Sequence, residues 1–78
     1  MSALLEEVRE SLALPAPPTA RQIREAAGVS QARLASELGV HEITVHRWEA
    51  GTHAPQGALR LAYGRLLSDL DQITRDMP

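Results

Sequence analysis

The stretch GVSQARLASELGVHEITVHRWEAG, residues 28–51, predicts the fold of this 78-residue chain. It contains two short helical patterns, over residues 31–38 and 42–50, and a glycine follows each of them. Ser30 is expected to cap the first pattern. Gly39 is expected to end it, because a residue without a Cβ accepts the left-handed backbone of a tight turn. Two helices joined by a short break that contains glycine predict a helix-turn-helix.

An amphipathic helix is expected before this stretch, over residues 2–14. Its apolar residues fall at helical spacing, at Leu4, Leu5, Val8 and Leu12. Ser2 is its expected cap, and the proline-rich link at residues 15–18 ends it. Another helix is predicted between a cap at Thr19 and the glycine at Gly28.

The chain after residue 51 predicts a final helix, with Pro55 in its first turn. Its apolar side chains are spaced four and three residues apart, at Leu59, Tyr63, Leu66, Leu70, Ile73 and Met77. Leu59 and Leu66 are expected to cover the helix-turn-helix, whereas the residues beyond them have less to cover within one chain. Gly64 and Ser68 weaken the helix, so a break near Ser68 into two helices stays open.

No segment shows the alternating pattern of a strand, so the predicted fold class is all-α. We expect a compact helix-turn-helix bundle of four or five helices with an extra N-terminal helix. The expected organisation is an amphipathic helix and proline-rich link over residues 1–18, a helix-turn-helix domain over 19–67 and a helical extension over 68–78.

Composition restricts the classes of function. The chain has no cysteine, which excludes disulfides and thiolate metal sites. It has no apolar run near the roughly 18 residues of a membrane span and no basic leader, so a cytoplasmic protein without membrane contact is expected. The net charge is −2, yet residues 21–65 hold six arginines against four glutamates. The excess acid therefore lies at the two ends, and the basic middle is compatible with a nucleic-acid partner.

Four short motifs carry a resemblance to a known family: Gly-Val-Ser-Gln at 28–31, Leu-Ala at 34–35, Leu-Gly-Val at 38–40 and Arg-Trp-Glu-x-Gly at 47–51. In this register residues 21–67 resemble the Cro/phage-repressor-like (XRE-type) helix-turn-helix transcriptional regulators. The resemblance implies a lambda-repressor-like domain and a sequence-specific DNA-binding regulator of bacterial or phage origin, associated with the nucleoid. It also implies a homodimer on a palindromic operator in double-stranded DNA.

The second helix of the motif, for which His41 is the expected cap, should have one face for the core and one for DNA. Val45 and Trp48 lie three residues apart and face inward. The outward face carries Ile43, His46, Arg47 and Ala50. By resemblance, the base-reading residues are Glu42, Ile43, Thr44, His46 and Arg47, and the phosphate contacts are Ser30, Gln31, Arg33, His41, Thr52 and His53. The resemblance also implies a structural ion pair between Arg24 and Glu49.

The two ends of the chain suggest contacts with other molecules. The downstream part of the last helix is a candidate dimer contact, through Leu66, Leu70, Ile73 and Met77. The N-terminal helix is either an intramolecular lid or an arm that docks a protein partner through residues 1–14, and the sequence does not separate the two.

Other functions stay open beside the regulator. An antitoxin uses the same fold to bind DNA and its terminal helices to neutralise a toxin. A protein-interaction module is favoured by Glu42, by the uncharged loop at Thr52–His53 and by the net negative charge. No nucleophile–base set, phosphate-binding loop or metal cluster is visible, so no catalysis, cofactor or metal is expected. The three histidines are surface residues or, as a hypothesis, raise DNA affinity when they are protonated between about pH 7.5 and 6.

Overall fold

The computed structural model describes residues 2–12 and 14–77, with the side chains of residues 7 and 10–12 left aside. It contains α1 (Ala3–Leu12), α2 (Pro17–Ala26), α3 (Gln31–Leu38), α4 (Glu42–Ala50) and α5 (Gly57–Asp76), and no strand among the described residues. The predicted all-α fold is therefore confirmed. Ala13 and the side chain of Leu12, which the sequence placed in the first helix, lie outside the described residues, as do residues 1 and 78 of the predicted segments.

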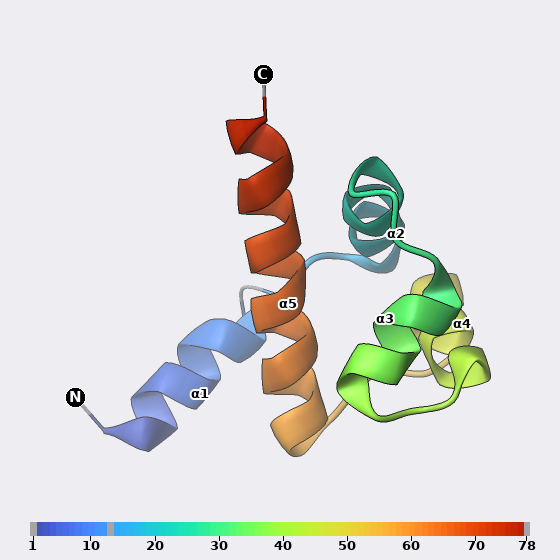
Figure 1. Ribbon diagram of the computed structural model, residues 1–78. Coiled ribbons are helices and arrows are strands. Elements are labelled where there is room, and N and C mark those ends of the chain that lie inside the picture. The colour runs from blue at the N-terminus through green and yellow to red at the C-terminus, as the bar shows by residue number, and fades with distance from the viewer. Residues whose placement is uncertain (1, 13, 78) are drawn as a thin grey trace.

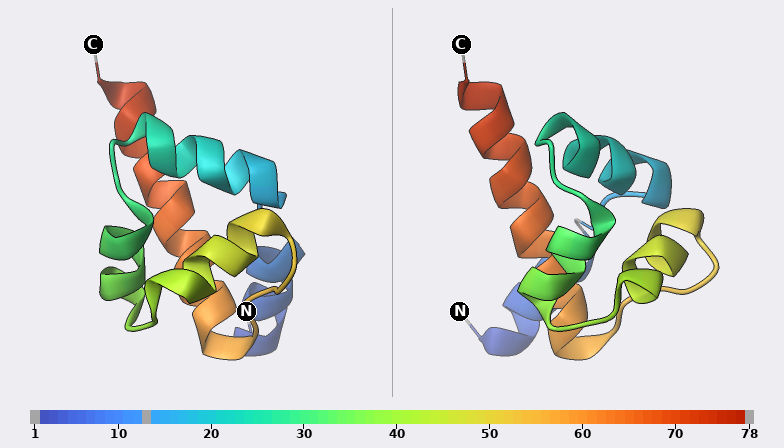
Figure 2. Two further views of the ribbon diagram at one scale, coloured as in Figure 1. Left: turned by 90° about the vertical axis from the view of Figure 1, so that its right-hand side faces the viewer. Right: turned by 45° about the vertical axis from the view of Figure 1, so that its right-hand side comes forward.

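Helix α5 lies between the other helices. In Figure 1, α1 lies on one side of α5 and α2, α3 and α4 lie on the other, and the helix contacts agree with this arrangement. Figure 2 shows α3 and α4 joined by their short turn at an angle, with α2 beside α5. The last turns of α5 extend beyond the neighbouring helices (Figures 1 and 2).

The core lies where α2, α3, α4 and α5 meet. Its buried apolar side chains are Ala20, Leu34, Ala35, Val45, Trp48, Tyr63 and Leu67. Ala35 of the Leu-Ala motif is 1% exposed and therefore belongs to this core. Leu14 of the link between α1 and α2 packs against this core from the side of α5, with its Cδ1 atom 3.6 Å from where a Cβ of Gly64 would lie.

The predicted caps at Ser2 and Ser30 and the predicted helix end at Gly39 are confirmed. The amide of Leu5 donates to Ser2 Oγ at 3.2 Å, and the amide of Arg33 donates to Ser30 Oγ at 3.0 Å. Gly39 has a φ of 72°, in the left-handed region, and so ends α3 as predicted.

Three predicted helix starts need correction. Thr19 does not cap α2, because the helix already begins at Pro17 and proline is well suited to the first helical position. His41 holds the expected cap position of α4, but its side chain accepts no capping hydrogen bond. Pro55 precedes α5 instead of lying in its first turn, and the helix begins at Gly57.

Helix α5 also differs from the prediction in its length and in its buried face. It runs without a break through Ser68, so tertiary packing outweighs the weak helix propensity of Gly64 and Ser68. Leu67 is fully buried although the predicted repeat omitted it, and Leu59 is 36% exposed, so it does not cover the core as expected. The buried stripe follows Tyr63 and Leu67, four residues apart.

Candidate nucleic-acid interface

Helix α4 divides its side chains between the core and the surface. Val45, Trp48 and Glu49 are buried. The opposite face carries four exposed residues: Ile43, His46, Arg47 and Ala50. This is the division that the spacing of Val45 and Trp48 predicted. Since Ile43 keeps half of its surface exposed, α4 presents a face of mixed apolar and cationic character.

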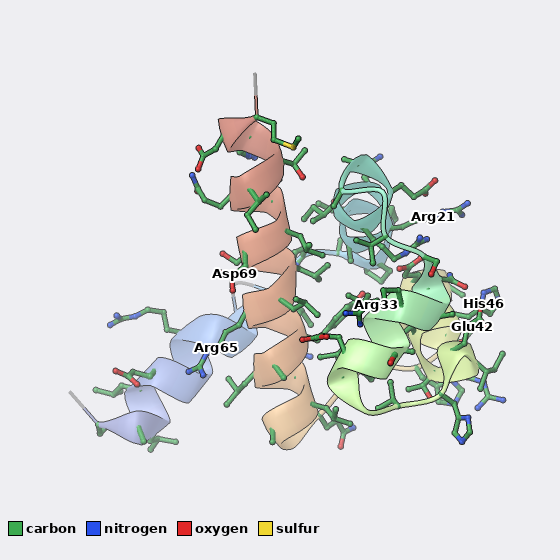
Figure 3. The ribbon with its side chains drawn as sticks, in the orientation of Figure 1. Arg21, Arg33, Glu42, His46, Arg65 and Asp69 are labelled. Carbon is green, nitrogen blue, oxygen red and sulfur yellow. The ribbon has the colours of Figure 1, made fainter. Side chains whose placement is uncertain are left out.

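A shallow hollow of about 320 Å³ lies between α3 and this face of α4. It is lined by Gln31 of α3 and by Glu42, Ile43 and His46 of α4. Figure 3 shows Glu42 and His46 together on the side of the molecule turned away from α5. The first amides of a helix have no acceptor within the helix, and the helix dipole adds positive potential there. The N-terminus of α3 therefore favours anions beside the exposed face of α4.

Arg47 differs from the other arginines of the chain. The other seven interact with neighbouring groups: Arg9, Arg21, Arg24, Arg33, Arg60, Arg65 and Arg75. Among the arginines of the described chain, Arg47 is the one whose side chain has no such partner. Its guanidinium keeps all its hydrogen-bond donors available on an exposed helix face.

Arg24 and Glu49 form the ion pair that the resemblance implies. Arg24 Nε donates to Glu49 Oε2 at 2.6 Å, and Arg24 Nη2 donates to Glu49 Oε1 at 2.9 Å. Arg24 Nη1 also donates to the Val29 carbonyl at 2.8 Å, and Gln31 Nε2 donates to Glu49 Oε1 at 3.1 Å. One buried carboxylate thus fixes α2, the start of α3 and α4 relative to one another.

The protonation equilibria of this pair favour its charged form. Burial raises the pKa of Glu49, but hydrogen bonds from Arg24 and Gln31 together with the Arg24 charge outweigh burial and hold the pKa below its ordinary value. The hydrogen bond to Glu49 raises the pKa of Arg24 above its ordinary value, against the effect of burial. The ion pair is therefore intact at neutral pH.

The structure brings most of the predicted contact residues to the two ends of α4 and the start of α3. His41 precedes α4, Thr52 and His53 follow it, and all three are exposed. Thr52 Oγ1 donates to the Arg47 carbonyl at 3.3 Å, which attaches this loop to the end of α4. Ser30 is exposed and Gln31 is half-buried at the start of α3.

Two predicted residues are not brought to this face. Arg33 lines a groove between α3 and α5 and bonds Glu37 at 3.1 Å. In Figure 3 it lies on the side of α3 that faces α5, whereas Glu42 and His46 lie on the far side. Thr44 is half-buried on α4, because it lies one turn before the buried Trp48.

Two features of the interface were missed by the sequence analysis. The Gln31–Glu49 hydrogen bond joins residues that no spacing rule relates, so the sequence held no signal for it. Arg21 lies on the same outer side of the molecule as Glu42 and His46 (Figure 3), where its Nε donates to Glu25 at 2.7 Å. The only signal for Arg21 was its place in the basic middle of the chain.

No group of three His, Asp or Glu side chains in the described part of the chain is arranged to hold a metal ion. None of the described helices combines the length and the apolar character needed to cross a membrane.

Comparison with models of protein families gives a match. A family model described as a helix-turn-helix domain matches residues 19–70, which contain α3, α4 and the greater part of α2 and α5. The N-terminal helix α1 lies outside the match. No curated protein and no solved structure matches the chain.

Proposed function

The chain belongs to this helix-turn-helix domain family, one of the XRE/Cro-like group, and from that membership we propose that it is a sequence-specific DNA-binding transcriptional regulator. We place it among the Cro and repressor type of bacterial or phage regulators, acting at the nucleoid in the cytoplasm. In this proposal α4 enters the major groove, which is wide enough to admit a helix.

The observation that carries the proposal is the state of Arg47. Its side chain lies on the exposed face of α4 and has no partner within the described chain, whereas the other arginines interact with neighbouring groups. A guanidinium held on a helix can donate two hydrogen bonds to O6 and N7 of a guanine. Arg47 is thus the residue that we assign to base recognition.

The neighbours of Arg47 complete the proposed contacts. Ile43 is suited to a thymine methyl group, and Glu42 to the amino group of a cytosine. Gln31 is proposed to contact a phosphate together with the first amides of α3, because helix N-termini bind anions. Ser30, His41, Thr52 and His53 stay candidates for phosphate contact, whereas Arg33 is omitted because it lies beside α5.

A homodimer on a palindromic site is the second part of the proposal. Leu66 and Leu70 of α5, together with Val29, line a groove of about 250 Å³ beside α3. Ile73 and Met77 are 60% and 68% exposed, one helical repeat further along α5. This apolar stripe is suited to the same stripe of a second copy, because two-fold pairing places two reading helices on one face of the DNA.

The test of DNA recognition starts from selection of bound sequences out of random DNA. The best site is then titrated with wild type, with Arg47→Ala and with Arg75→Ala, a matched control whose arginine lies on α5. We expect Arg47→Ala to weaken binding by about 5- to 150-fold, as for loss of an arginine–guanine pair, and Arg75→Ala to leave it within twofold. No enriched sequence, or equal binding by all three proteins, would overturn the proposal.

The test of dimerisation is sedimentation velocity across protein concentrations. Ile73→Glu and Met77→Glu are expected to convert a dimer to a monomer, because each places a charge in the apolar stripe. Gln72→Glu adds the same charge to an exposed position of α5 outside the stripe and should leave the dimer intact. A wild-type chain that stays monomeric at high concentration would contradict the dimer.

One observation favours an alternative function, that of a protein-interaction module. Leu4, Leu5 and Val8 of α1 are 66%, 55% and 48% exposed. An amphipathic helix with three exposed apolar side chains is suited to a partner protein. Failure of the DNA selection, together with loss of a co-purifying protein on deletion of residues 2–12, would favour this function over the regulator.

A further inference from the structure

Glu42 and Ile43, the first two residues of α4, face one hollow although their chemistry is opposite. Both line the hollow between α3 and α4, together with Gln31 and His46. Ile43 is the one large apolar side chain that is exposed in α2, α3 and α4, helices that the structure describes throughout. Glu42 is exposed and has no hydrogen bond or ion pair with any residue of the described chain. The hollow therefore presents an unpaired carboxylate and an uncovered apolar group to the same small region of a partner.

Each of these two side chains restricts the base that it can meet, if α4 enters the major groove as proposed above, and the present inference rests on that proposal. A carboxylate accepts hydrogen bonds and is repelled by phosphate. Glu42 therefore requires an amino group, which only cytosine and adenine present in this groove. Ile43 requires an apolar group, and among the four ordinary bases only thymine presents one, its C5 methyl group. No ordinary base has both groups.

Base pairs also differ in what lies next to the methyl group. In a T·A pair the O4 acceptor of thymine lies between the methyl group and the adenine amino group, so it repels a carboxylate placed beside the methyl group. In 5-methylcytosine the methyl group and the amino group are on neighbouring ring atoms, and one amino N–H points into the groove. Methylation of the amino nitrogen itself leaves no such N–H, because the remaining hydrogen pairs with the opposite base. The edge of 5-methylcytosine thus matches the hollow.

We propose that the hollow at the start of α4 reads 5-methylcytosine in double-stranded DNA. Glu42 accepts a hydrogen bond from the N4 amino group, and Ile43 covers the C5 methyl group. His46, which lies beside Glu42 in Figure 3, carries a ring N–H in its neutral and its charged form and can donate to O6 of the paired guanine. The chain then distinguishes DNA by its modification as well as by its sequence, which goes beyond the guanine contact assigned to Arg47.

The experiment selects bound sequences from two random libraries, one amplified with ordinary dCTP and one with 5-methyl-dCTP. The best site of the methylated library is then synthesised with one 5-methylcytosine at a time replaced by cytosine, or by thymine opposite adenine. At the position read by the hollow, cytosine should weaken binding about fourfold, as expected when one methyl group is no longer buried. Thymine keeps the methyl group but replaces the donor by an acceptor, and should weaken binding by about 5- to 150-fold.

Two variants separate the two contacts. Ile43→Ala should bind cytosine and 5-methylcytosine alike and still reject thymine, because the carboxylate remains. Glu42→Gln should keep the preference for 5-methylcytosine over cytosine and accept thymine within about twofold, because an amide can donate as well as accept. Glu37→Gln removes a carboxylate that lines the groove between α3 and α5 and should change neither preference. Circular dichroism establishes that each variant is folded.

The outcomes distinguish this inference from the DNA recognition on which it rests. Enriched sites that bind equally well with cytosine and with 5-methylcytosine at every position would overturn the inference and leave DNA recognition in place. A methyl preference that folded Ile43→Ala retains, or a rejection of thymine that folded Glu42→Gln retains, would also overturn it, since other residues would then read the base. No enriched sequence in either library would overturn both proposals.

Discussion

The centre of this chain, residues 19–51, buries most of its large apolar side chains, whereas the two ends of the chain leave theirs exposed. In residues 19–51 the large apolar residues Leu34, Val45 and Trp48 are buried, and Arg47 is left exposed and unpaired. In α1 and the last turns of α5 the reverse holds, because Leu4, Leu5, Ile73 and Met77 are exposed. Arginine pairing does not divide the chain in this way, because Arg75 of α5 is paired with Asp71, and Arg21, Arg24 and Arg33 of the centre are paired as well.

This contrast separates two kinds of surface. The centre uses most of its large apolar residues for its own fold, and its exposed face carries the unpaired Arg47 beside the half-exposed Ile43. The ends have apolar residues that the chain itself does not cover, together with an excess of acid that repels DNA. We infer that the centre contacts nucleic acid and that the ends contact protein.

The largest difference between the two regions in the loss of unfolding free energy is expected when an ion pair is broken. Arg24→Ala leaves Glu49, whose side chain is 3% exposed, as an unpaired buried carboxylate. The free energy of unfolding should fall by about 3–5 kcal/mol. Arg75→Ala breaks a pair whose side chains are 74% and 38% exposed, and should cost at most about 1 kcal/mol. Urea unfolding followed by circular dichroism compares the two, and equal costs would remove the contrast.

The same comparison can be made for apolar residues of α5. Leu67 is fully buried and Ile73 is 60% exposed. Leu67→Ala should lower the free energy of unfolding by about 2–5 kcal/mol, and Ile73→Ala by less than about 0.5 kcal/mol in dilute protein.

Protein concentration sharpens this test. A dimer formed through the end of α5 would make the cost of Ile73→Ala grow with concentration, because association stabilises the folded state. The cost of Leu67→Ala should stay large at every concentration. An Ile73→Ala effect that does not depend on concentration would argue against the dimer contact.

Low pH should lower the stability of the centre, because it protonates the Glu49 carboxylate. The folded-state pKa of Glu49 is lowered, so its contribution to stability is present above the ordinary pKa of a glutamate and is lost as pH falls below it. The stability advantage of wild type over Glu49→Gln should therefore shrink from about pH 5 downward. Thermal unfolding of both proteins between pH 7 and pH 3 measures this difference. A constant difference over that range would show that the ion pair contributes nothing.

The smallest expected difference in stability is between the loss of one helix cap in the centre and the loss of a matched cap in α1. Ser30 and Ser2 each accept a hydrogen bond from the amide three residues later, at 3.0 and 3.2 Å. Ser30→Ala should cost about 1 kcal/mol of global stability. Ser2→Ala should cost much less, because fraying of α1 leaves the core of α2–α5 in place. Similar losses would mean that α1 unfolds together with the centre.

The central helices followed from their sequence because local chemistry determines them. A serine before α3, a glycine after α3 and α4, and the spacing of Val45 and Trp48 each act within a few residues. The start of α2 was displaced from Thr19 because Pro17 begins a helix without a side-chain cap. Such a shift moves the start of a helix by a few residues and leaves the architecture unchanged.

The parts that the sequence did not predict depend on distant contacts. Leu67 could not be distinguished from Leu66 until α5 was placed against α2 and α3. Arg33 was assigned to DNA by its place in the motif, yet α5 lies along that side of α3. The hydrogen bond between Gln31 and Glu49 and the hollow that Gln31 shares with α4 likewise need the folded chain, because their groups come from different helices.

The burial of Tyr63 and Leu67 in α5 has a consequence for the order of synthesis. A ribosome adds roughly 5–20 residues per second, and it synthesises α4 before these two residues. Leu34, Val45 and Trp48 then have no α5 to pack against, so α4 is not yet held in position. Incomplete chains are therefore expected to be unable to compete for DNA. The concentration of active protein then follows the number of completed chains and not the number of chains begun.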